Sequence, residues 1–157
     1  TGQVDCSPRG DYPGFIQTLD NNTIALPDRP GNNRLDSLTN IIERRNVGVL
    51  VLIPGFKECL RINGTAKIVT DSDILQRFEH QGKLPKTAII VSIEEIYFHC
   101  AKAITRSKLW ASESHVSRDV MPTLGKLLMS QVDPKRTDKE IRAVEELIKV
   151  REKTTLY

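Results

Sequence analysis

The sequence has few aromatic residues, no block of one charge and no long apolar run. Phe, Tyr and Trp make up 5% of the 157 residues, and 23 Lys and Arg are nearly balanced by 20 Asp and Glu along the chain. Nucleic-acid-binding domains carry clustered cations and, for single strands, stacking aromatics, so we expect no nucleic-acid partner. A membrane span needs roughly 18 or more consecutive apolar residues, so we expect no membrane partner either.

Cysteine is also scarce, and its spacing is uninformative for metals. Cys6, Cys59 and Cys100 form an odd set with no C-x-x-C pair, and the three histidines are isolated from one another. Structural zinc sites need closely spaced Cys and His ligands, so no metal is expected. Unpaired thiols packed as small hydrophobic groups are typical of the reducing cytoplasm, which predicts a cytoplasmic location.

The glycine-rich signatures of nucleotide-binding folds are missing as well. Neither G-x-G-x-x-G nor G-x-x-x-x-G-K-[ST] occurs, which argues against a dinucleotide-binding or P-loop fold. The chain starts at Thr1 without a charged and apolar leader. We therefore expect that an N-terminal segment has been lost.

Short alternating segments separated by turn residues predict antiparallel strands. Residues 14–20 and 23–26 flank an Asp-Asn-Asn turn, and residues 47–53 and 59–69 flank a Pro-Gly turn. Residues 87–98 begin with a continuous apolar run, which indicates a central strand. These segments predict two hairpins and one further strand of the same sheet.

Helical periodicity and capping signals appear between and after these strands. A Thr-x-x-Glu capping box opens the last of the predicted helices. The predicted helices cover residues 34–45, 71–81, 101–109, 123–131 and 137–152. Because strands and helices do not alternate strictly, we expect one domain over residues 1–157, mainly β in the α+β class, built as a small antiparallel β-barrel with peripheral helices.

The loop over residues 27–37, P-D-R-P-G-N-N-R-L-D-S, carries the strongest local signal for a ligand. Backbone N–H groups of such a loop and of the following helix N-terminus can surround an anion. Arg29 and Arg34 add guanidinium groups and Ser37 adds a hydroxyl, which together suit a phosphate. The alternative is an ordinary strand-to-helix loop with Asn33 as N-cap, and the local sequence leaves both open.

Two further stretches offer binding groups. Residues 5–11, D-C-S-P-R-G-D, are small or rigid and would let the backbone approach a flat ligand, with Arg9 as a clamp; a polar strand end with a turn is the alternative. In residues 99–110, Lys102 and Arg106 share one helix face and Trp110 completes a cationic and aromatic patch for a planar anion. A solvated helix face with a half-buried tryptophan is the alternative there.

Together these stretches resemble the pyridoxamine 5'-phosphate oxidase-like family. The resemblance rests on V-D-C-S-P-R-G-D, R-P-G-N-N-R-L-D-S-L, L-R-I-N-G and F-H-C-A-K-A with R-S-K-L-W, in that order along almost the whole chain. It implies an antiparallel split β-barrel of six strands that forms a homodimer and binds FMN at the subunit interface. It also implies an N-terminal helix and a first barrel strand, which the sequence does not contain upstream of Thr1.

The resemblance carries over to individual positions of this sequence. The phosphate group of the flavin would lie at the strand-to-helix loop and the ring along residues 7–10, while the 102–110 patch would close the site, from the same or the partner subunit. The predicted cofactor-binding residues are therefore Ser7, Arg9, Arg29, Asn32, Asn33, Arg34, Ser37, Lys102, Arg106 and Trp110.

Two classes of function remain open from the sequence. One is an FMN-dependent oxidoreductase acting on a small molecule, in which Arg9 or Lys102 would stabilise the negatively charged reduced ring. The other is an FMN-binding protein without turnover, such as a carrier, sensor or stress-related protein. A split barrel that binds another cofactor, such as haem, is a further alternative. No catalytic residue stands out, because no nucleophile, base and orienting group share a local pattern.

Overall fold

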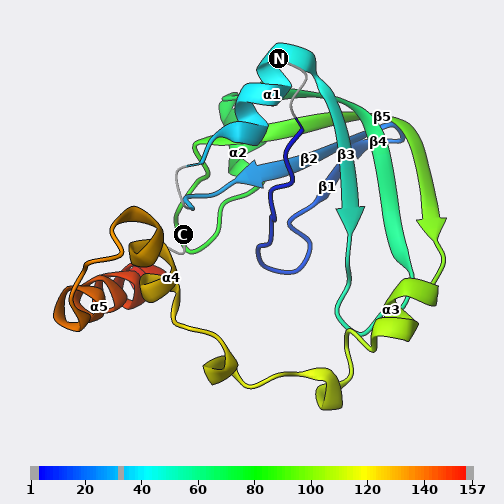
Figure 1. The fold of residues 1–157 in the computed structure, drawn as a ribbon. Coiled ribbons are helices and arrows are strands. Elements are labelled where there is room, and N and C mark those ends of the chain that lie inside the picture. Colours follow the sequence, from blue (N-terminus) through cyan, green and yellow to red (C-terminus); the bar gives the residue numbers. More distant parts are fainter. Residues whose placement is uncertain (1–3, 32–33, 155–157) are drawn as a thin grey trace. The chain divides into compact units, whose positions relative to one another are not determined.

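The computed structural model describes residues 4–31 and 34–154, which divide into two compact units (Figure 1). The first unit extends to Trp110 and the second begins at Ala111. Within the described residues, no helix is both long and apolar enough to cross a bilayer. The expectation of one domain over the whole chain stays a prediction.

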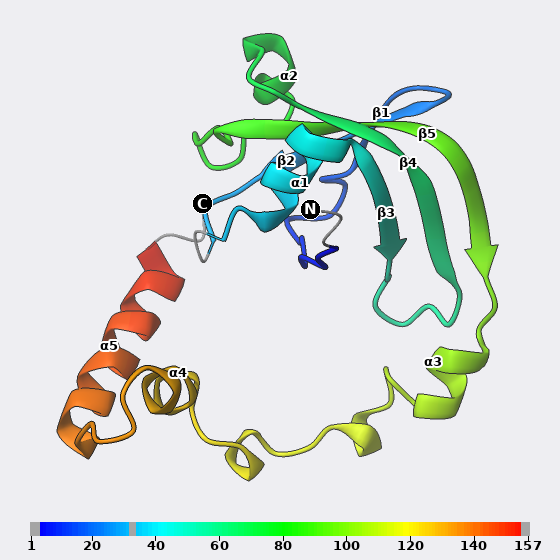
Figure 2. The ribbon, with the colours of Figure 1, turned by 45° about the horizontal axis from the view of Figure 1, so that its top comes forward.

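The first unit contains a five-stranded antiparallel sheet, as Figures 1 and 2 show. Its order is β1-β2-β5-β4-β3. The strands are β1 (Gln17–Asp20), β2 (Thr23–Asp28), β3 (Asn46–Val51), β4 (Cys59–Val69) and β5 (Thr87–His99). Both predicted hairpins and the central place of the last strand are confirmed. The resemblance implies a split barrel of six strands, whereas the described residues form a sheet of five strands, with β1 and β3 as open edges.

The alternation of apolar and polar residues along β4 accounts for its one buried face. Ile62, Gly64 and Ala66 point to one face and are buried, as the alternation predicts. The register with β5 shifts by one residue between Asn63 and Gly64, which makes a β-bulge. A Cβ added at Gly64 would lie 2.0 Å from the carbonyl oxygen of Ser92, so glycine is required by the close approach of the two backbones.

Helices cover both faces at one end of the sheet. Helix α1 (Asp36–Arg44) packs Ile41 against one face, and helix α2 (Ser72–Gln76) lies against the other, where Phe78 is fully buried. The core of the α1 face consists of Ile24, Leu26, Ile41, Ile62, Ala66, Ile89 and Val91. The antiparallel, mainly β architecture with peripheral helices is therefore confirmed.

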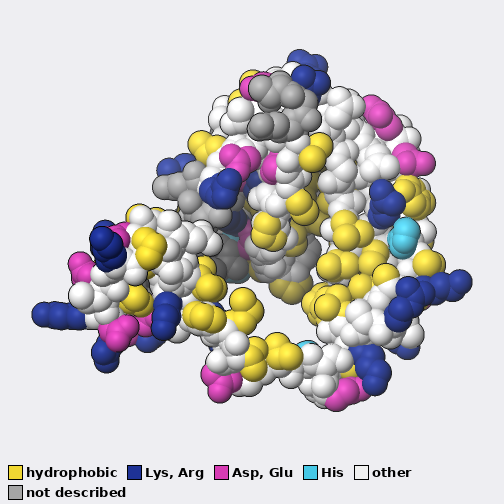
Figure 3. All heavy atoms as spheres, in the orientation of Figure 1, with side chains coloured by type: hydrophobic (Ala, Val, Ile, Leu, Met, Phe, Trp, Pro, Cys, Tyr) yellow, Lys and Arg dark blue, Asp and Glu magenta, His cyan; other side chains and the backbone are white. Residues whose placement is uncertain are grey.

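The other end of the same sheet leaves large apolar side chains exposed. In β5, Ile96 pairs with the buried Ile62, so it lies on the same face, yet it is 53% exposed, and Phe98 is 77% exposed. Figure 3 shows hydrophobic side chains gathered at this hairpin end of β3 and β4. We call this surface the distal apolar patch; it comprises Leu52, Ile53, Phe56, Ile96 and Phe98.

Helix α2 is shorter than predicted. The sequence predicts a helix as far as residue 81, but α2 ends at Gln76. Gln81 and Gly82 both have positive φ angles and lie in a turn closed by paired backbone bonds between His80 and Lys83. The helix ends before Phe78, whose side chain is buried with Ala25, Ala88 and Ile90 on the α2 face of the sheet.

The second unit is helical. It holds two short 3-10 turns, Ser112–Ser114 and Arg118–Val120, followed by α4 (Leu124–Val132) and α5 (Asp138–Thr154). The predicted capping box at the start of α5 is confirmed, because the Thr137 N–H donates to Glu140 Oε2 at 2.9 Å and the Glu140 N–H donates to Thr137 Oγ1 at 3.4 Å.

Candidate functional site

The loop after β2 leads into the N-terminus of α1, where the sequence places a phosphate site. Leu35 occupies the N-cap position, and within the described part of the chain no side chain makes a capping hydrogen bond there, while Asp36 places a carboxylate in the first turn. Arg34 pairs with Asp36 at 3.0 Å, and both side chains are more than half exposed. Asn32 and Asn33, also predicted to bind the phosphate, lie outside the described residues.

The N-terminal stretch crosses this helix end. Asp5 accepts a hydrogen bond from the Ser37 hydroxyl and a second from Asn40 Nδ2, at 2.7 Å. The Ser37 bond is the main reason that the pKa of Asp5 lies below its ordinary value, with Asn40 and the nearby charge of Arg9 acting in the same direction. At neutral pH a carboxylate therefore occupies the donors that an anionic ligand would use.

A hollow of about 340 Å³ lies between the two stretches. It brings together three predicted ligands from different stretches: Ser7 from residues 5–11, and Arg34 and Ser37 from the loop over residues 27–37. The full lining is Asp5, Cys6, Ser7, Pro8, Arg34, Asp36 and Ser37. The lining therefore offers two hydroxyl groups, one guanidinium group and two carboxylates.

Two other predicted ligands, Arg9 and Arg29, hold the N-terminal stretch in place. Arg9 pairs with Asp28 at the end of β2. Arg29 pairs with Asp11 at 2.7 Å, and their side chains are only 10% and 2% exposed. The Arg29 guanidinium also donates to the backbone carbonyl groups of residues 78 and 83. In this arrangement both arginines serve the architecture around the hollow and neither lines it.

We call residues 5–12 the strap, because it is attached at both ends. Beyond the ion pairs, the Tyr12 ring stacks on His80 with ring centres 4.4 Å apart. Sequence reasoning missed Asp5, Asp11 and Asp28 as partners. The only signal was a carboxylate near each arginine in the motifs, and it does not reveal which of them will meet.

The third predicted group lies elsewhere in the first unit. Helix α3 (Lys102–Ser107) follows β5 and carries exposed Lys102 and Arg106. Trp110 donates its ring N–H to the carbonyl group of Phe56, beyond the far end of β3. The hollow lies at the start of α1, and both views of the first unit draw α3 well away from that end of the helix (Figures 1 and 2). One chain alone does not bring the two groups together.

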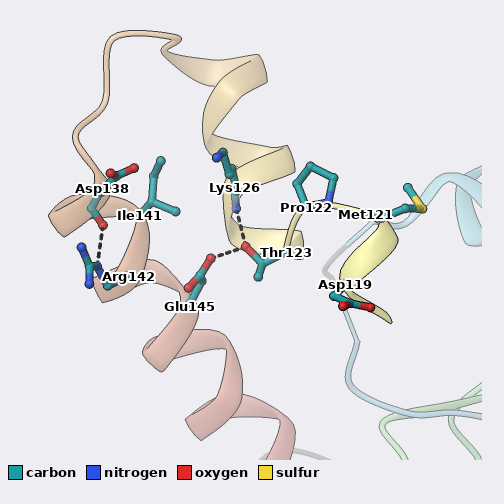
Figure 4. A pocket seen from close by; sticks show the side chains of 9 residues that line it. All are labelled: Asp119, Met121, Pro122, Thr123, Lys126, Asp138, Ile141, Arg142 and Glu145. Carbon is teal, nitrogen blue, oxygen red and sulfur yellow. Dashed lines mark hydrogen bonds between the residues drawn. The ribbon is translucent and has the colours of Figure 1, made fainter. Parts of the chain in front are cut away.

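A second hollow, of about 510 Å³, lies in the helical unit between the segment before α4 and the start of α5 (Figure 4). Thr123 there hydrogen-bonds to Glu145, and Arg142 donates to the backbone carbonyl of Asp138. The sequence predicts no ligand at this place. Among the described residues, no cluster of three or more His, Cys, Asp or Glu side chains is arranged to hold a metal ion.

Comparison with known proteins places the first unit in a family. No curated protein matches the chain. Among solved structures, HupZ of Group A Streptococcus is 17% identical, with a TM-score of 0.45 over 54% of this chain and 68% of HupZ. A point variant of HupZ gives 19%, a TM-score of 0.44, and 54% and 73%. The model of the family described as pyridoxamine 5'-phosphate oxidase matches residues 2–100. The chain therefore belongs to the pyridoxamine 5'-phosphate oxidase family, as its motifs predict.

Proposed function

We propose that this protein is an FMN-binding flavoprotein and an oxidoreductase acting on a small molecule. The observation that carries the proposal is the hollow at the start of α1, where Ser7, Arg34 and Ser37 meet in a chain of this family. These residues come from two separate motifs that were each predicted to bind the cofactor. Their meeting at one hollow is the tertiary arrangement that such a function requires.

The residues around the hollow fit a phosphate group. A helix N-terminus, a guanidinium group and two hydroxyl groups are the donors that phosphate sites use. The Arg34–Asp36 pair is exposed and therefore weak, so breaking this ion pair costs little. Asp5 and Asp36 oppose an anion, which means that binding must rearrange at least one of these carboxylates.

A whole flavin needs more protein contact surface than the hollow offers. We propose that a second copy of the chain supplies the rest. The distal apolar patch supports a homodimer, because exposed apolar side chains gathered on one face favour association. In such a dimer the partner's α3 region would bring Lys102, Arg106 and Trp110 to the flavin. The three free thiols are in keeping with a cytoplasmic location.

FMN, when bound, would supply the redox chemistry. The residues of this chain would bind and orient it: Arg34 and Ser37 would hold the phosphate, and residues 7–10 would lie along the ring. Arg9 is paired with Asp28, so any role for it beside the reduced ring would require that pair to loosen. No described residue is assigned as the catalytic acid or base.

The first test is an absorption spectrum of the freshly purified protein, followed by mass spectrometry of the material that heat releases. A flavin spectrum with FMN released supports the proposal. Titration of the ligand-free protein with FMN, using Ser37→Ala and the matched control Ser130→Ala in the other unit, then locates the site. We expect Ser37→Ala to weaken FMN binding and Ser130→Ala to leave it unchanged.

Two further measurements distinguish an oxidoreductase from a carrier or sensor, and FMN from haem. Oxidation of NADH or NADPH by the FMN-loaded protein supports an oxidoreductase, whereas full occupancy without turnover favours a carrier or sensor. A colourless protein that does not take up added FMN overturns the proposal. A Soret band in place of a flavin spectrum would assign haem as the ligand.

A further inference from the structure

The strap is attached strongly at one end and weakly at the other. At residues 9–12, the Arg29–Asp11 ion pair is almost completely buried and a stacked ring pair adds to it. At the opposite end, the exposed Asp5 accepts two side-chain hydrogen bonds from the surface of α1, and within residues 4–31 and 34–154 these are its hydrogen bonds to other side chains. Exposed polar contacts of this kind contribute little, whereas breaking a buried ion pair is costly.

The residues between the two attachments form one wall of the hollow. Cys6, Ser7 and Pro8 all line it, so movement of the strap changes the hollow directly. Because the buried attachment persists while the exposed one is weak, opening would take place at the Asp5 end and turn about residues 9–12. The structure thus combines a fixed hinge end with a releasable end at the candidate phosphate site.

We propose that the strap is a closure over the hollow, and that Asp5 is an internal anion that the phosphate group of the ligand replaces on α1. The inference rests on the proposed function, since it takes the FMN phosphate as the displacing group. The Ser37 hydroxyl has a single proton to donate, so it cannot serve Asp5 and a phosphate oxygen together. Binding through Ser37 therefore requires Asp5 to leave.

This arrangement makes a prediction that separates the phosphate from the rest of the flavin. Neutralising Asp5 removes a charged competitor and a repulsive carboxylate, which helps FMN but not riboflavin, because riboflavin carries no phosphate. We expect Asp5→Asn to tighten FMN binding about three- to ten-fold and to leave riboflavin binding unchanged. Asp5→Ala, which also removes the acceptor atoms, should tighten FMN binding at least as much.

The matched control is Asp119→Asn. Asp119 is an exposed carboxylate that accepts a hydrogen bond from the Ser117 hydroxyl, as Asp5 does from Ser37, but it lies in the helical unit. This variant should leave both flavin affinities unchanged. Equal effects of the Asp5 and Asp119 variants, or an Asp5 variant that shifts FMN and riboflavin affinities together, would overturn the inference.

Inorganic phosphate distinguishes failure of this inference from failure of the proposed function. Without any flavin, millimolar phosphate should raise the unfolding temperature of Asp5→Asn more than that of the wild type. If this occurs while neither protein binds FMN, the proposed function fails and the displacement of Asp5 stands. If FMN binds both proteins equally and phosphate stabilises both equally, the proposed function stands and the inference fails.

Discussion

Arg29 and Arg34 stand at the two ends of one loop, and the fold uses them differently. Arg29 lies at the end of β2 with its guanidinium almost buried between Asp11 and backbone carbonyl groups. Arg34 lies at the start of α1, three-quarters exposed, and lines the hollow. In the sequence both belong to the same motif and both were predicted to bind the cofactor.

The difference shows that a motif can mix two tasks. A buried arginine with several fixed partners cannot leave them without a large desolvation cost, so it suits a structural attachment. An exposed ion pair such as Arg34–Asp36 can open when an anion arrives, because solvent already screens it. The loop thus fixes the strap with one end and offers a ligand contact with the other.

The largest expected effect comes from removing the buried arginine. Arg29→Ala leaves Asp11 buried without its ion-pair partner, so we expect the free energy of unfolding to fall by about 3–5 kcal/mol. Denaturant unfolding followed by the fluorescence of Trp110, which belongs to the same unit, measures this change. Arg34→Ala is the matched control and should shift stability by less than about 0.5 kcal/mol. If both variants lost the same unfolding free energy, the different roles of Arg29 and Arg34 would be refuted.

For FMN affinity we expect the larger effect at Arg34, the residue whose removal should affect stability least. Arg34→Gln removes a charged donor from the hollow, and a hydrogen bond to a charged group contributes about 1.5–3 kcal/mol, so FMN affinity should fall roughly ten-fold or more. Riboflavin affinity should change little, because the lost contact is to the phosphate. Isothermal titration with both flavins tests this. An unchanged FMN affinity would exclude Arg34 from the site.

The smallest expected effect concerns pH and the weakly attached end of the strap. The pKa of Asp5 in the folded protein is lowered from the ordinary value of 3.8, so its ionised form stabilises the fold above that pH. This contribution is lost as pH falls below 3.8 through the folded pKa, and exposure limits it to a few tenths of a kcal/mol. The unfolding free energies of wild type and Asp5→Asn should therefore keep a constant difference well above pH 3.8 and converge as the pH falls below that value. If the difference in unfolding free energy did not change with pH, it would not arise from ionisation of Asp5.

Local patterns predicted much of the first unit. The Asp-Asn-Asn turn, the alternation along β4 and the apolar run of β5 correctly predicted two hairpins and a central strand, because these features depend on neighbours in the chain. The start of α5 followed from its capping box for the same reason. Helix α2 was predicted too long, since the packing of Phe78 depends on strands distant in sequence.

For the site, the sequence by itself determined which residues carry suitable chemistry. It selected Ser7, Arg34 and Ser37, since hydroxyl and guanidinium groups near a helix start are local properties of the chain. Only the tertiary structure decided that Asp11 would bury itself against Arg29 and that Asp5 would reach α1. Both pairings join residues 18 or more positions apart, and such contacts are set by the path of the chain over the sheet, which no local pattern encodes.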